Sequence, residues 1–328
     1  MNPRGSIRER IDVIDLPKLA SSCSDRMESE MERAGRLGSP IPAPISEIVT
    51  EGESVVTIWI EVPASLADSY KPGQYFMCWN PYDAEGGMGR PNYHSEKPYS
   101  VGDIRIDRSS VDESSSADSG AAGKVHLGFT VKDLGRQSGE LTRLQAGDLL
   151  AIRGPFGTTF PRLATGSTLI LVSGGIGSTP MHMAARDARI RHGDKIKIHA
   201  IMGFRNEAEA HYIERMEGLC DSLTITTDDG SLGVHGYPTA PLGDLLSSCD
   251  SNTTQLYTCG PEPMMKPVLA AAESVGVTSF AAMERYLPCS VAVCGLCMVG
   301  DRLTCREGPV MEGDWLLEQD DFGSHHAH

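Results

Sequence analysis

The sequence predicts an α+β and α/β multidomain protein with an antiparallel β-barrel, a parallel doubly wound domain and a small cysteine-rich domain. The first half carries short β-rich runs separated by turn residues, which is typical of a small barrel. The second half alternates apolar strands with helical runs, which is typical of a doubly wound sheet. Four cysteines fall between Cys289 and Cys305, close to the C-terminus.

The bulk composition is that of a globular protein and excludes several classes of function. The chain has 328 residues, of which 40% are hydrophobic and 22% charged, enough for about two domains. A net charge of −15 argues against nucleic-acid binding, which relies on clustered Lys and Arg. No run approaches the roughly 18–20 apolar residues of a membrane-spanning helix, and the N-terminus lacks a secretory signal. We therefore expect a cytoplasmic protein that binds neither nucleic acid nor membrane.

Changes of composition along the chain predict the domain boundaries. Residues 1–44 are typical of a disordered or poorly structured extension that ends in a proline-rich segment. The barrel is expected over 45–162, with a flexible insertion rich in Ser, Asp and Gly at 108–123. The doubly wound domain is expected over 163–278, and the cysteine-rich domain with its tail over 279–328.

Each predicted strand combines β-branched, aromatic or aliphatic residues with turn residues at its ends. In the barrel these segments are 54–62, 72–79 (a turn running into a strand), 97–101, 125–131 and 148–154. In the doubly wound half the strands are 167–172, 195–202, 222–227 and, as the last, 255–258. The helices of that half are expected from Pro180, over 208–219 and over 263–275.

The clustered cysteines predict a metal centre. Their spacing is C-x4-C-x2-C-x7-C, over Cys289, Cys294, Cys297 and Cys305. The opening C-x4-C-x2-C is the plant-type [2Fe–2S] pattern, and soft thiolates favour iron–sulfur clusters, Zn and Cu(I). A four-thiolate zinc site is the alternative, although such sites usually pair two short knuckles. A disulfide framework fits poorly in a long chain without a secretory signal.

A glycine-rich turn follows the apolar strand at 167–172 and opens a helix. Its members include Gly174, Gly175, Gly177 and Pro180. Glycines permit a diphosphate to approach the free amides of a helix N-terminus closely. Alone this turn is weak evidence for a nucleotide, because strand–helix turns of this kind are common.

Cys259, Gly260 and Pro261 follow the last predicted strand, at the edge of the sheet where ligands bind. Cys259 is therefore a candidate catalytic thiol beside a bound nucleotide. An inert buried cysteine is the alternative.

The stretch from Lys97 to Ser100 places a cation, an aromatic ring and a hydroxyl close together, around Pro98. Lys97 suits a phosphate, Tyr99 suits stacking on a ring and Ser100 suits a polar flavin edge. The four residues together suit a flavin dinucleotide. A plain edge strand is the alternative.

Taken together, these motifs resemble the ferredoxin–NADP reductase superfamily, and within it the electron-transfer subunits of dihydroorotate dehydrogenase. The resemblance covers residues 45–323. The family's flavin motif matches Lys97–Ser100, and a second flavin segment looks like Thr130, Val131, Lys132, Gln137 and Ser138. The other matching segments are Gly154–Gly157, Gly174–Pro180, Thr227–Gly233, Cys259–Met265, Glu284–Tyr286 and Cys305–Val310.

The chain departs from the family pattern at three positions. Lys97 replaces the usual Arg, which keeps the charge and loses the bidentate fork. Ser290 and Ala292 stand where glycines are typical, and altered packing there would tune the potential of a cluster.

The resemblance implies that FAD, a [2Fe–2S] cluster and NAD are the cofactors, and that the four clustered cysteines are the cluster ligands. It implies that Cys259 lies near the nicotinamide and flavin. It further implies a partner, the FMN-containing dihydroorotate dehydrogenase catalytic subunit, in a heterotetramer of two subunits of each kind. Electrons would pass from that partner through the cluster and FAD to NAD+, in pyrimidine biosynthesis.

Two alternatives remain at this point. A NAD(P)H-linked FAD/[2Fe–2S] reductase subunit of a hydrogenase, sulfide dehydrogenase or ferredoxin-dependent transhydrogenase would share these motifs. A non-enzymatic zinc-binding interaction module belongs to another class. The sequence has no obvious basic pocket for a 2′-phosphate, but Arg205, after the second strand of the sheet, leaves NADP open.

Overall fold

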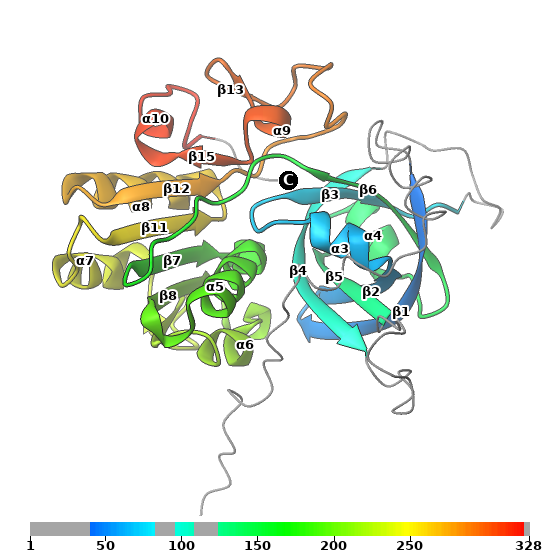
Figure 1. Ribbon diagram of the computed structural model, residues 1–328, viewed down its shortest axis with the longest axis horizontal. Coiled ribbons are helices and arrows are strands. Elements are labelled where there is room, and N and C mark those ends of the chain that lie inside the picture. The colour runs from blue at the N-terminus through cyan, green and yellow to red at the C-terminus, as the bar shows by residue number, and fades with distance from the viewer. Residues whose placement is uncertain (1–39, 83–95, 108–123, 325–328) are drawn as a thin grey trace, which may run out of the picture.

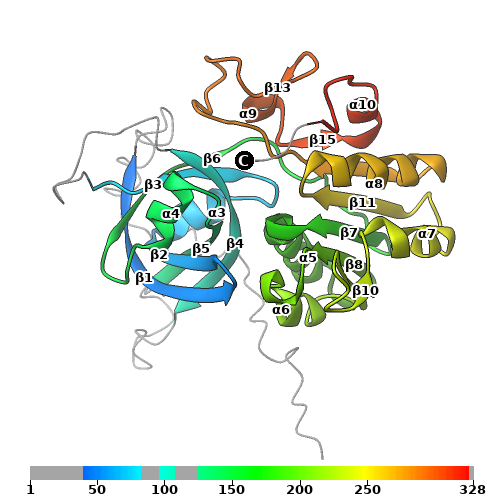
Figure 2. The ribbon, with the colours of Figure 1, turned by 180° about the vertical axis from the view of Figure 1, so that it is seen from behind.

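A closed β-barrel and a twisted sheet lie side by side, and the C-terminal segment lies across the top of both in the view of Figure 1; Figure 2 shows the same arrangement from behind. The computed structural model describes residues 40–82, 96–107 and 124–324. The predicted insertion at 108–123 and residues 1–39 of the predicted extension lie outside the described residues. Among the described helices, none is long and apolar enough to span a membrane.

The barrel has six antiparallel strands in the order β1-β2-β5-β4-β3-β6. The register places Ile58 opposite Phe129 and Ile60 opposite Leu127, and all four side chains are buried in the barrel interior. The strands are β1 (Ile41–Gly52), β2 (Val55–Val62), β3 (Tyr75–Trp79), β4 (Lys97–Asp107), β5 (Lys124–Lys132) and β6 (Leu149–Phe156), with short helices α3 (Ala64–Ser69) and α4 (Arg136–Thr142).

Strand β1 begins inside the stretch that the sequence predicted to be part of the extension, which corrects that boundary. Residues 41–44 pair with β6, despite the prolines at 42 and 44. Ile45 exchanges hydrogen bonds with residues 147 and 148 on the β6 side. Successive residues of a strand direct their backbone N–H positions to opposite sides. Because Ile45 bonds toward β6, the backbone nitrogens of Pro42 and Pro44 face away from β6, and their missing N–H groups remove no bond between β1 and β6.

The second half is a seven-stranded sheet in the order β10-β9-β8-β7-β11-β12-β15, parallel except for β15. The strand order reverses between β7 and β11, which is the position where doubly wound sheets bind ligands. The strands are β7 (Thr168–Gly174), β8 (Lys197–Phe204), β9 (Ser222–Thr227), β10 (Val234–His235), β11 (Thr254–Cys259), β12 (Thr278–Ala282) and β15 (Val310–Glu312).

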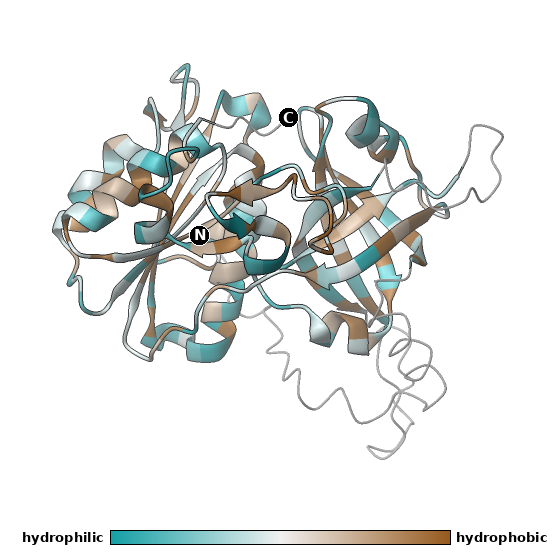
Figure 3. Ribbon diagram, turned by 90° about the horizontal axis from the view of Figure 1, so that it is seen from above, coloured by the Kyte–Doolittle hydropathy of each residue, from teal (hydrophilic) through white to brown (hydrophobic). Residues whose placement is uncertain are grey.

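Helices cover both faces of this sheet, as the sequence predicted. Along β7, Leu169 and Leu171 belong to the apolar cluster under one face, and Ile170 and Val172 to the cluster under the other. Figure 3 shows the hydrophobic residues concentrated in the strands of barrel and sheet. The helices are α5 (Ser178–His192) and α6 (Ile213–Glu217) on one face, and α7 (Thr239–Ser247) and α8 (Glu262–Ser274) on the other.

Two further predictions about the sheet are wrong. The strand at 255–258 is not the last, because β12 and β15 extend the sheet beyond it. The helix predicted over 208–219 is broken into a 3-10 turn at 207–209 and α6, because Tyr212 adopts a left-handed conformation with φ of 66°. A non-glycine residue in that region ends regular helix.

The segment between β12 and β15 carries the cysteines and has little regular structure. It contains the two-residue strands β13 (Met298–Val299) and β14 (Arg302–Leu303) and one turn of helix, α9 (Thr304–Glu307). After β15 the chain forms α10 (Gly313–Leu317), which packs against α8 and β12.

Polar contacts fix the barrel against the sheet. The hydroxyls of Thr130 on β5 and Tyr212 share a hydrogen bond of 2.7 Å in the buried interface. Lys132, two residues further along β5, forms an ion pair of 2.6 Å with Glu209. The left-handed Tyr212 is therefore at once the helix break and a contact between the two halves.

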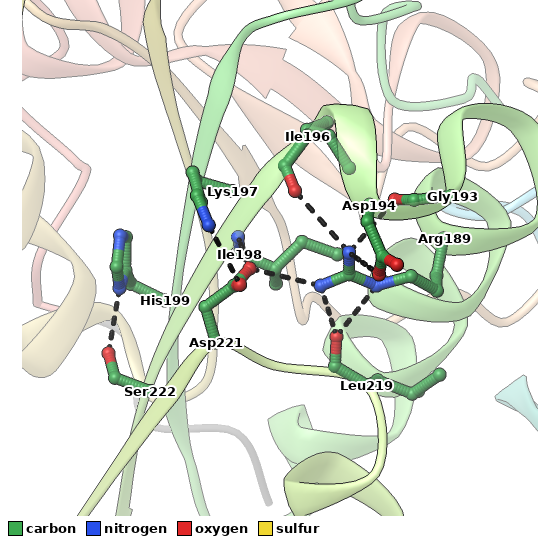
Figure 4. A network of polar contacts seen from close by, with 10 residues as sticks. All are labelled: Arg189, Gly193, Asp194, Ile196, Lys197, Ile198, His199, Leu219, Asp221 and Ser222. Carbon is green, nitrogen blue, oxygen red and sulfur yellow. Dashed lines mark hydrogen bonds and ion pairs between the residues drawn. The ribbon is translucent and has the colours of Figure 1, made fainter. Parts of the chain in front are cut away.

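A second polar network, drawn in Figure 4, joins the end of α5 to the sheet. Arg189 donates from Nη2 to the Leu219 carbonyl at 2.7 Å and to the Asp221 carboxylate at 3.0 Å. The same carboxylate accepts a bond from the backbone N–H of Ile198 at 2.9 Å. The network fixes the start of β9 relative to β8.

A buried ion pair joins the barrel to the cysteine segment. Glu96 and Arg153 are fully or almost fully buried and lie 2.6 Å apart. Arg153 also donates to the backbone carbonyl of Cys289 at 3.1 Å. The first of the four clustered cysteines is thus attached to strand β6 through a buried guanidinium.

We expect Glu96→Gln to lower the free energy of unfolding by about 3 kcal/mol, because it leaves the buried Arg153 charge uncompensated. The matched control is Glu61→Gln, whose carboxylate pairs with Lys124 at 2.8 Å with side-chain exposures of 38% and 54%. Loss of that exposed pair should cost less than about 1 kcal/mol. Urea midpoints of the two variants check this difference, and equal midpoints would contradict it.

Candidate functional site

A cavity of about 590 Å³ lies where the barrel, the sheet and the C-terminal segment meet. Ten of the residues predicted to bind a cofactor or act in catalysis line it: Lys97, Pro98, Tyr99, Ser100, Thr130, Lys132, Gln137, Ser138, Pro180 and Cys259. The structure therefore gathers residues from four separate sequence motifs around one space.

The barrel supplies one wall through β4, β5 and the start of α4. Lys97–Ser100 is the first part of β4, paired antiparallel with β3. Thr130 and Lys132 are two residues apart on β5, and both line the cavity. Val131, between them, is 1% exposed and belongs to the barrel core, so its side chain does not line the cavity.

Lys97 faces an aromatic residue from the opposite wall. Its ammonium lies 4.7 Å from the centre of the Tyr286 ring. Partial burial lowers the pKa of Lys97 from its usual value. Both side chains line the cavity, so a planar or anionic ligand would meet an aromatic face and a cation together.

The sheet supplies the second wall through the turn after β7. Gly175 has φ of 54° and open space where a side chain would stand. Gly177 allows the closest approach in the turn, because a Cβ there would collide with the carbonyl of Cys259. Gly174, Gly175, Gly177, Gly260 and Pro261 are not among the cavity-lining residues; they form the adjoining edge of the sheet at the ends of β7 and β11.

Cys259 and Glu284 form a pair at the base of the cavity. The Cys259 thiol donates to Glu284 Oε1 at 3.6 Å, and both residues line the cavity. Burial raises the pKa of Cys259 well above its usual value. Burial also raises the pKa of Glu284, to about 7, and the contact with Cys259 opposes that rise. Near neutral pH, Glu284 is therefore present in both its protonated and its ionised form.

Glu284 and Arg285 were not predicted as site residues, although both lie in a segment that matched the family motif. Arg285 is buried, pairs with Glu262 at 2.5 Å, and donates to the carbonyl of Met298 at 3.2 Å and of Asp321 at 3.1 Å. The feature visible in the sequence was the adjacent pair of a glutamate and an arginine after a predicted helix. The role of Arg285 could not be predicted, because its partners Glu262 and Met298 are distant from it in the chain.

The four clustered cysteines lie close to one another. Cys294 interacts electrostatically with Cys289 and Cys297, and Cys305 interacts with Cys297 and Cys289. Within the described part of the chain, no group of three or more His, Cys, Asp or Glu residues converges as if around one metal ion. A [2Fe–2S] cluster contains two irons, so its four thiolate ligands need not converge on one point as the ligands of a tetrahedral zinc ion do.

The backbone around the cysteines turns its amides toward the sulfurs. The Cys289 thiol is surrounded by the N–H groups of Val291, Val293 and Cys294. Burial raises the pKa of Cys289, but these hydrogen bonds outweigh it and bring the pKa to about 7. Amides aimed at sulfur are the environment that a thiolate cluster needs.

Two non-glycine residues of this loop adopt left-handed conformations. Ser290 has φ of 56° and Ala292 has φ of 60°. These are the two positions at which the chain departs from the glycines typical of the related family. The structure gives the reason for the family pattern, because glycine adopts this conformation without steric cost.

The cysteine loop packs directly against the barrel. Cys297 and Cys305 are buried in one apolar cluster with Tyr75, Met77 and Leu287. Tyr75 and Leu287 also line the cavity. The cavity and the cysteines are therefore separated by shared side chains rather than by solvent.

Comparisons with known proteins identify the family. Residues 171–269 match the family described as the oxidoreductase NAD-binding domain. The chain is 35% identical over 286 residues to a protein of Methanocella arvoryzae named probable dihydroorotate dehydrogenase B (NAD(+)), electron transfer subunit, a match that covers 86% of this chain and 93% of that protein. The chain belongs to the family of dihydroorotate dehydrogenase B (NAD(+)) electron transfer subunits. A second member, from Methanocaldococcus jannaschii, is 31% identical over 288 residues and is covered to 95%.

Solved structures agree with the fold of this electron transfer subunit family. The structure of an NADH-dependent reduced ferredoxin-NADP oxidoreductase, from work on flavin-based electron bifurcation, matches with a TM-score of 0.66, covering 85% of this chain and 90% of that chain at 22% identity. A ferredoxin NADP+ reductase from Neisseria gonorrhoeae with bound FAD and NADP matches with a TM-score of 0.55, covering 76% and 95% at 17% identity. The resemblance drawn from the motifs and the predicted barrel-plus-sheet fold are thus confirmed.

The raised pKa of Glu284 makes a prediction about stability and pH. Its pKa lies near 7 in the folded protein and near 4.5 when unperturbed, so between these values the folded state binds more protons than the unfolded state. The resulting stabilisation is complete at low pH and is lost as pH rises toward 7. Relative to Glu284→Gln, the wild type should lose roughly 2 kcal/mol between about pH 5 and about pH 8.

Urea midpoints of wild type and Glu284→Gln across that range measure the difference. Glu273→Gln, at an exposed position on α8, is the control and should track the wild type. Parallel pH curves for wild type and Glu284→Gln would contradict the assignment.

Proposed function

We propose that this chain passes electrons from an FMN-containing dihydroorotate dehydrogenase catalytic subunit, through a [2Fe–2S] cluster and FAD, to NAD+. The observation that carries the proposal is the shared wall between the cavity and the cysteine loop, formed by Tyr75 and Leu287, which pack with Cys297 and Cys305. A reductase that only bound flavin and nicotinamide would have no need to place four cysteines behind that wall.

The cavity residues fit a flavin dinucleotide. Lys97 and Tyr99 offer a cation and an aromatic ring on β4, and Thr130 and Ser138 offer hydroxyls on the same barrel wall. Bound FAD would supply the exchange between hydride chemistry at nicotinamide and single electrons at a cluster. The protein's part is to orient the rings and exclude water.

The edge of the sheet fits the dinucleotide that delivers or accepts hydride. The open turn at Gly175 and the N-terminus of α5 would hold its diphosphate. Cys259 and Glu284 would then lie beside the nicotinamide, where Cys259 positions the ring and Glu284 holds a proton near neutral pH.

The cysteine loop fits a cluster that faces a partner protein. Cys294 is exposed, and Val291, Val293, Leu296 and Met298 around it are large apolar residues with exposures of 50%, 81%, 61% and 44%. A contiguous exposed apolar patch is typical of a protein interface. We propose that this patch receives the catalytic subunit, in an assembly of two subunits of each kind, so that electrons enter at Cys294.

The experiment that tests the proposal combines composition with activity. The purified chain should contain FAD, iron and acid-labile sulfide, and with the FMN-containing subunit it should form NADH from dihydroorotate and NAD+. Cys297→Ser should lose the cluster absorbance and the coupled activity while keeping FAD. The matched control is Cys249→Ser, at a half-buried position on the far side of the sheet, which should keep both.

Other outcomes assign the chain elsewhere. Native copurification with a hydrogenase or another large flavoprotein, with no dihydroorotate turnover, would replace the physiological role and keep the cofactors. A colourless zinc protein without flavin would refute the cofactors as well.

The acidic end of β9 predicts a preference for NAD over NADP. Asp228 and Asp229 follow β9, and Arg205 after β8 lies near Asp228 and 4.0 Å from Glu209. The only cation that the sequence offered for a 2′-phosphate is therefore surrounded by carboxylates. NADP would bring a further dianion into this acidic environment.

We expect the double variant Asp228→Asn/Asp229→Asn to lower the ratio of the NADP dissociation constant to the NAD dissociation constant about tenfold. The reason is that two charges that repel the 2′-phosphate are removed. The control Glu214→Gln/Glu217→Gln, on α6, makes the same change in net charge at other exposed positions. Isothermal titration with both nucleotides measures the ratio. An equal change in both double variants would show a general charge effect and reject the local one.

A further inference from the structure

Tyr75 occupies the position between the cavity and the cysteine loop. It lies on β3, is 3% exposed, lines the cavity, and belongs to the apolar cluster that holds Cys297 and Cys305. Its hydroxyl also donates to the backbone carbonyl of Cys305 at 3.5 Å. One side chain therefore contacts the proposed flavin site and a proposed cluster ligand.

Ser290 holds this contact from the loop side. It is 4% exposed, and its hydroxyl donates to the sulfur of Met77 at 2.9 Å. The same hydroxyl lies beside the phenol of Tyr75, whose pKa is raised by burial. The neighbouring carbonyl of Cys289 is fixed by Arg153.

Ser290 has a left-handed backbone conformation, which glycine adopts more easily than serine. A serine with φ of 56° is strained where glycine would not be. The strain comes with a buried hydroxyl placed between Tyr75 and Met77, a contact that glycine could not make. Ser290 is thus a positioning residue rather than a neutral replacement.

We propose that Tyr75 forms the packed path for single electrons between flavin and cluster, and that Ser290 positions it. The inference rests on the proposed function. Each transfer between flavin and cluster moves one electron and makes or breaks no bond. In the test below, NADH is the two-electron reductant. It gives hydride to the flavin, and the electrons then pass one at a time through this path. Tunnelling is faster through packed atoms than through a gap, and hydrogen-bond partners behind metal ligands tune the centre.

The test follows NADH-driven reduction of the purified protein by stopped flow. Flavin bleaching should keep its wild-type rate in Ser290→Gly and Ser290→Ala, because Ser290 does not line the cavity. The later loss of cluster absorbance should slow about tenfold in Ser290→Gly and Ser290→Ala, and less in Tyr75→Phe, which keeps the ring. The electron paramagnetic resonance spectrum of the reduced cluster should shift in all three, a readout that does not depend on turnover.

Two control variants make the same kinds of substitution at positions outside the cavity and the cysteine loop. Ser54→Gly changes a serine with φ of 58° in the turn between β1 and β2, and Tyr257→Phe removes a buried hydroxyl that donates to Pro161 in the sheet. Both should match the wild type in rate and spectrum.

The outcomes separate this inference from the proposed function. A wild-type protein without iron would overturn both. A wild-type cluster, with unchanged rates and spectra in the Tyr75 and Ser290 variants, would overturn this inference and leave the proposed function standing. Loss of iron from the Ser290 variants, with the remaining clusters reduced at the wild-type rate, would also overturn it, because the role would then be structural.

Discussion

The geometry of the site depends on the guanidinium of Arg285. It joins Glu262 at the start of α8, the carbonyl of Met298 beside the last cysteines, and Asp321 in the C-terminal tail. A buried ion pair contributes little net stability, because desolvation of both charges offsets their attraction. Its contribution here is geometric, because it joins the start of α8, which follows Cys259, to the cysteine loop and to the tail.

The sequence predicted the elements whose signals are local. Strand and helix periodicity marked β2, β5, β7, β9 and α8 within a few residues, and cysteine spacing marked the candidate ligands. It failed where pairing is decided at long range. Residues 41–44 look like a proline-rich linker until β6 lies beside them, and the three-residue β15 is too short to show a period. Glu284 acquires its role only when β11 brings Cys259 to it.

The cysteine loop shows how spacing and conformation carry different information. The spacing of the four cysteines predicted a cluster but not the backbone conformation that brings the cysteines together. That backbone enters the left-handed region at Ser290 and Ala292, at a cost of roughly 1 kcal/mol or more for each residue. The hydrogen bond from the Ser290 hydroxyl to Met77 and the packing of Ala292 in the apolar cluster of Leu287 offset part of that cost.

The antiparallel pairing of β15 with β12 has a consequence for the order of assembly. The two strands are neighbours in the sheet, and the cysteine loop leaves from one and returns to the other. The bonds that close this loop are backbone bonds between Phe280–Ala282 and Val310–Glu312, none of which involves a cysteine. In contrast to a small zinc domain, whose folding waits for its ion, the strands that carry the loop of proposed cluster ligands pair without any of those ligands. Loading of the proposed cluster would then be a separate step on a folded scaffold.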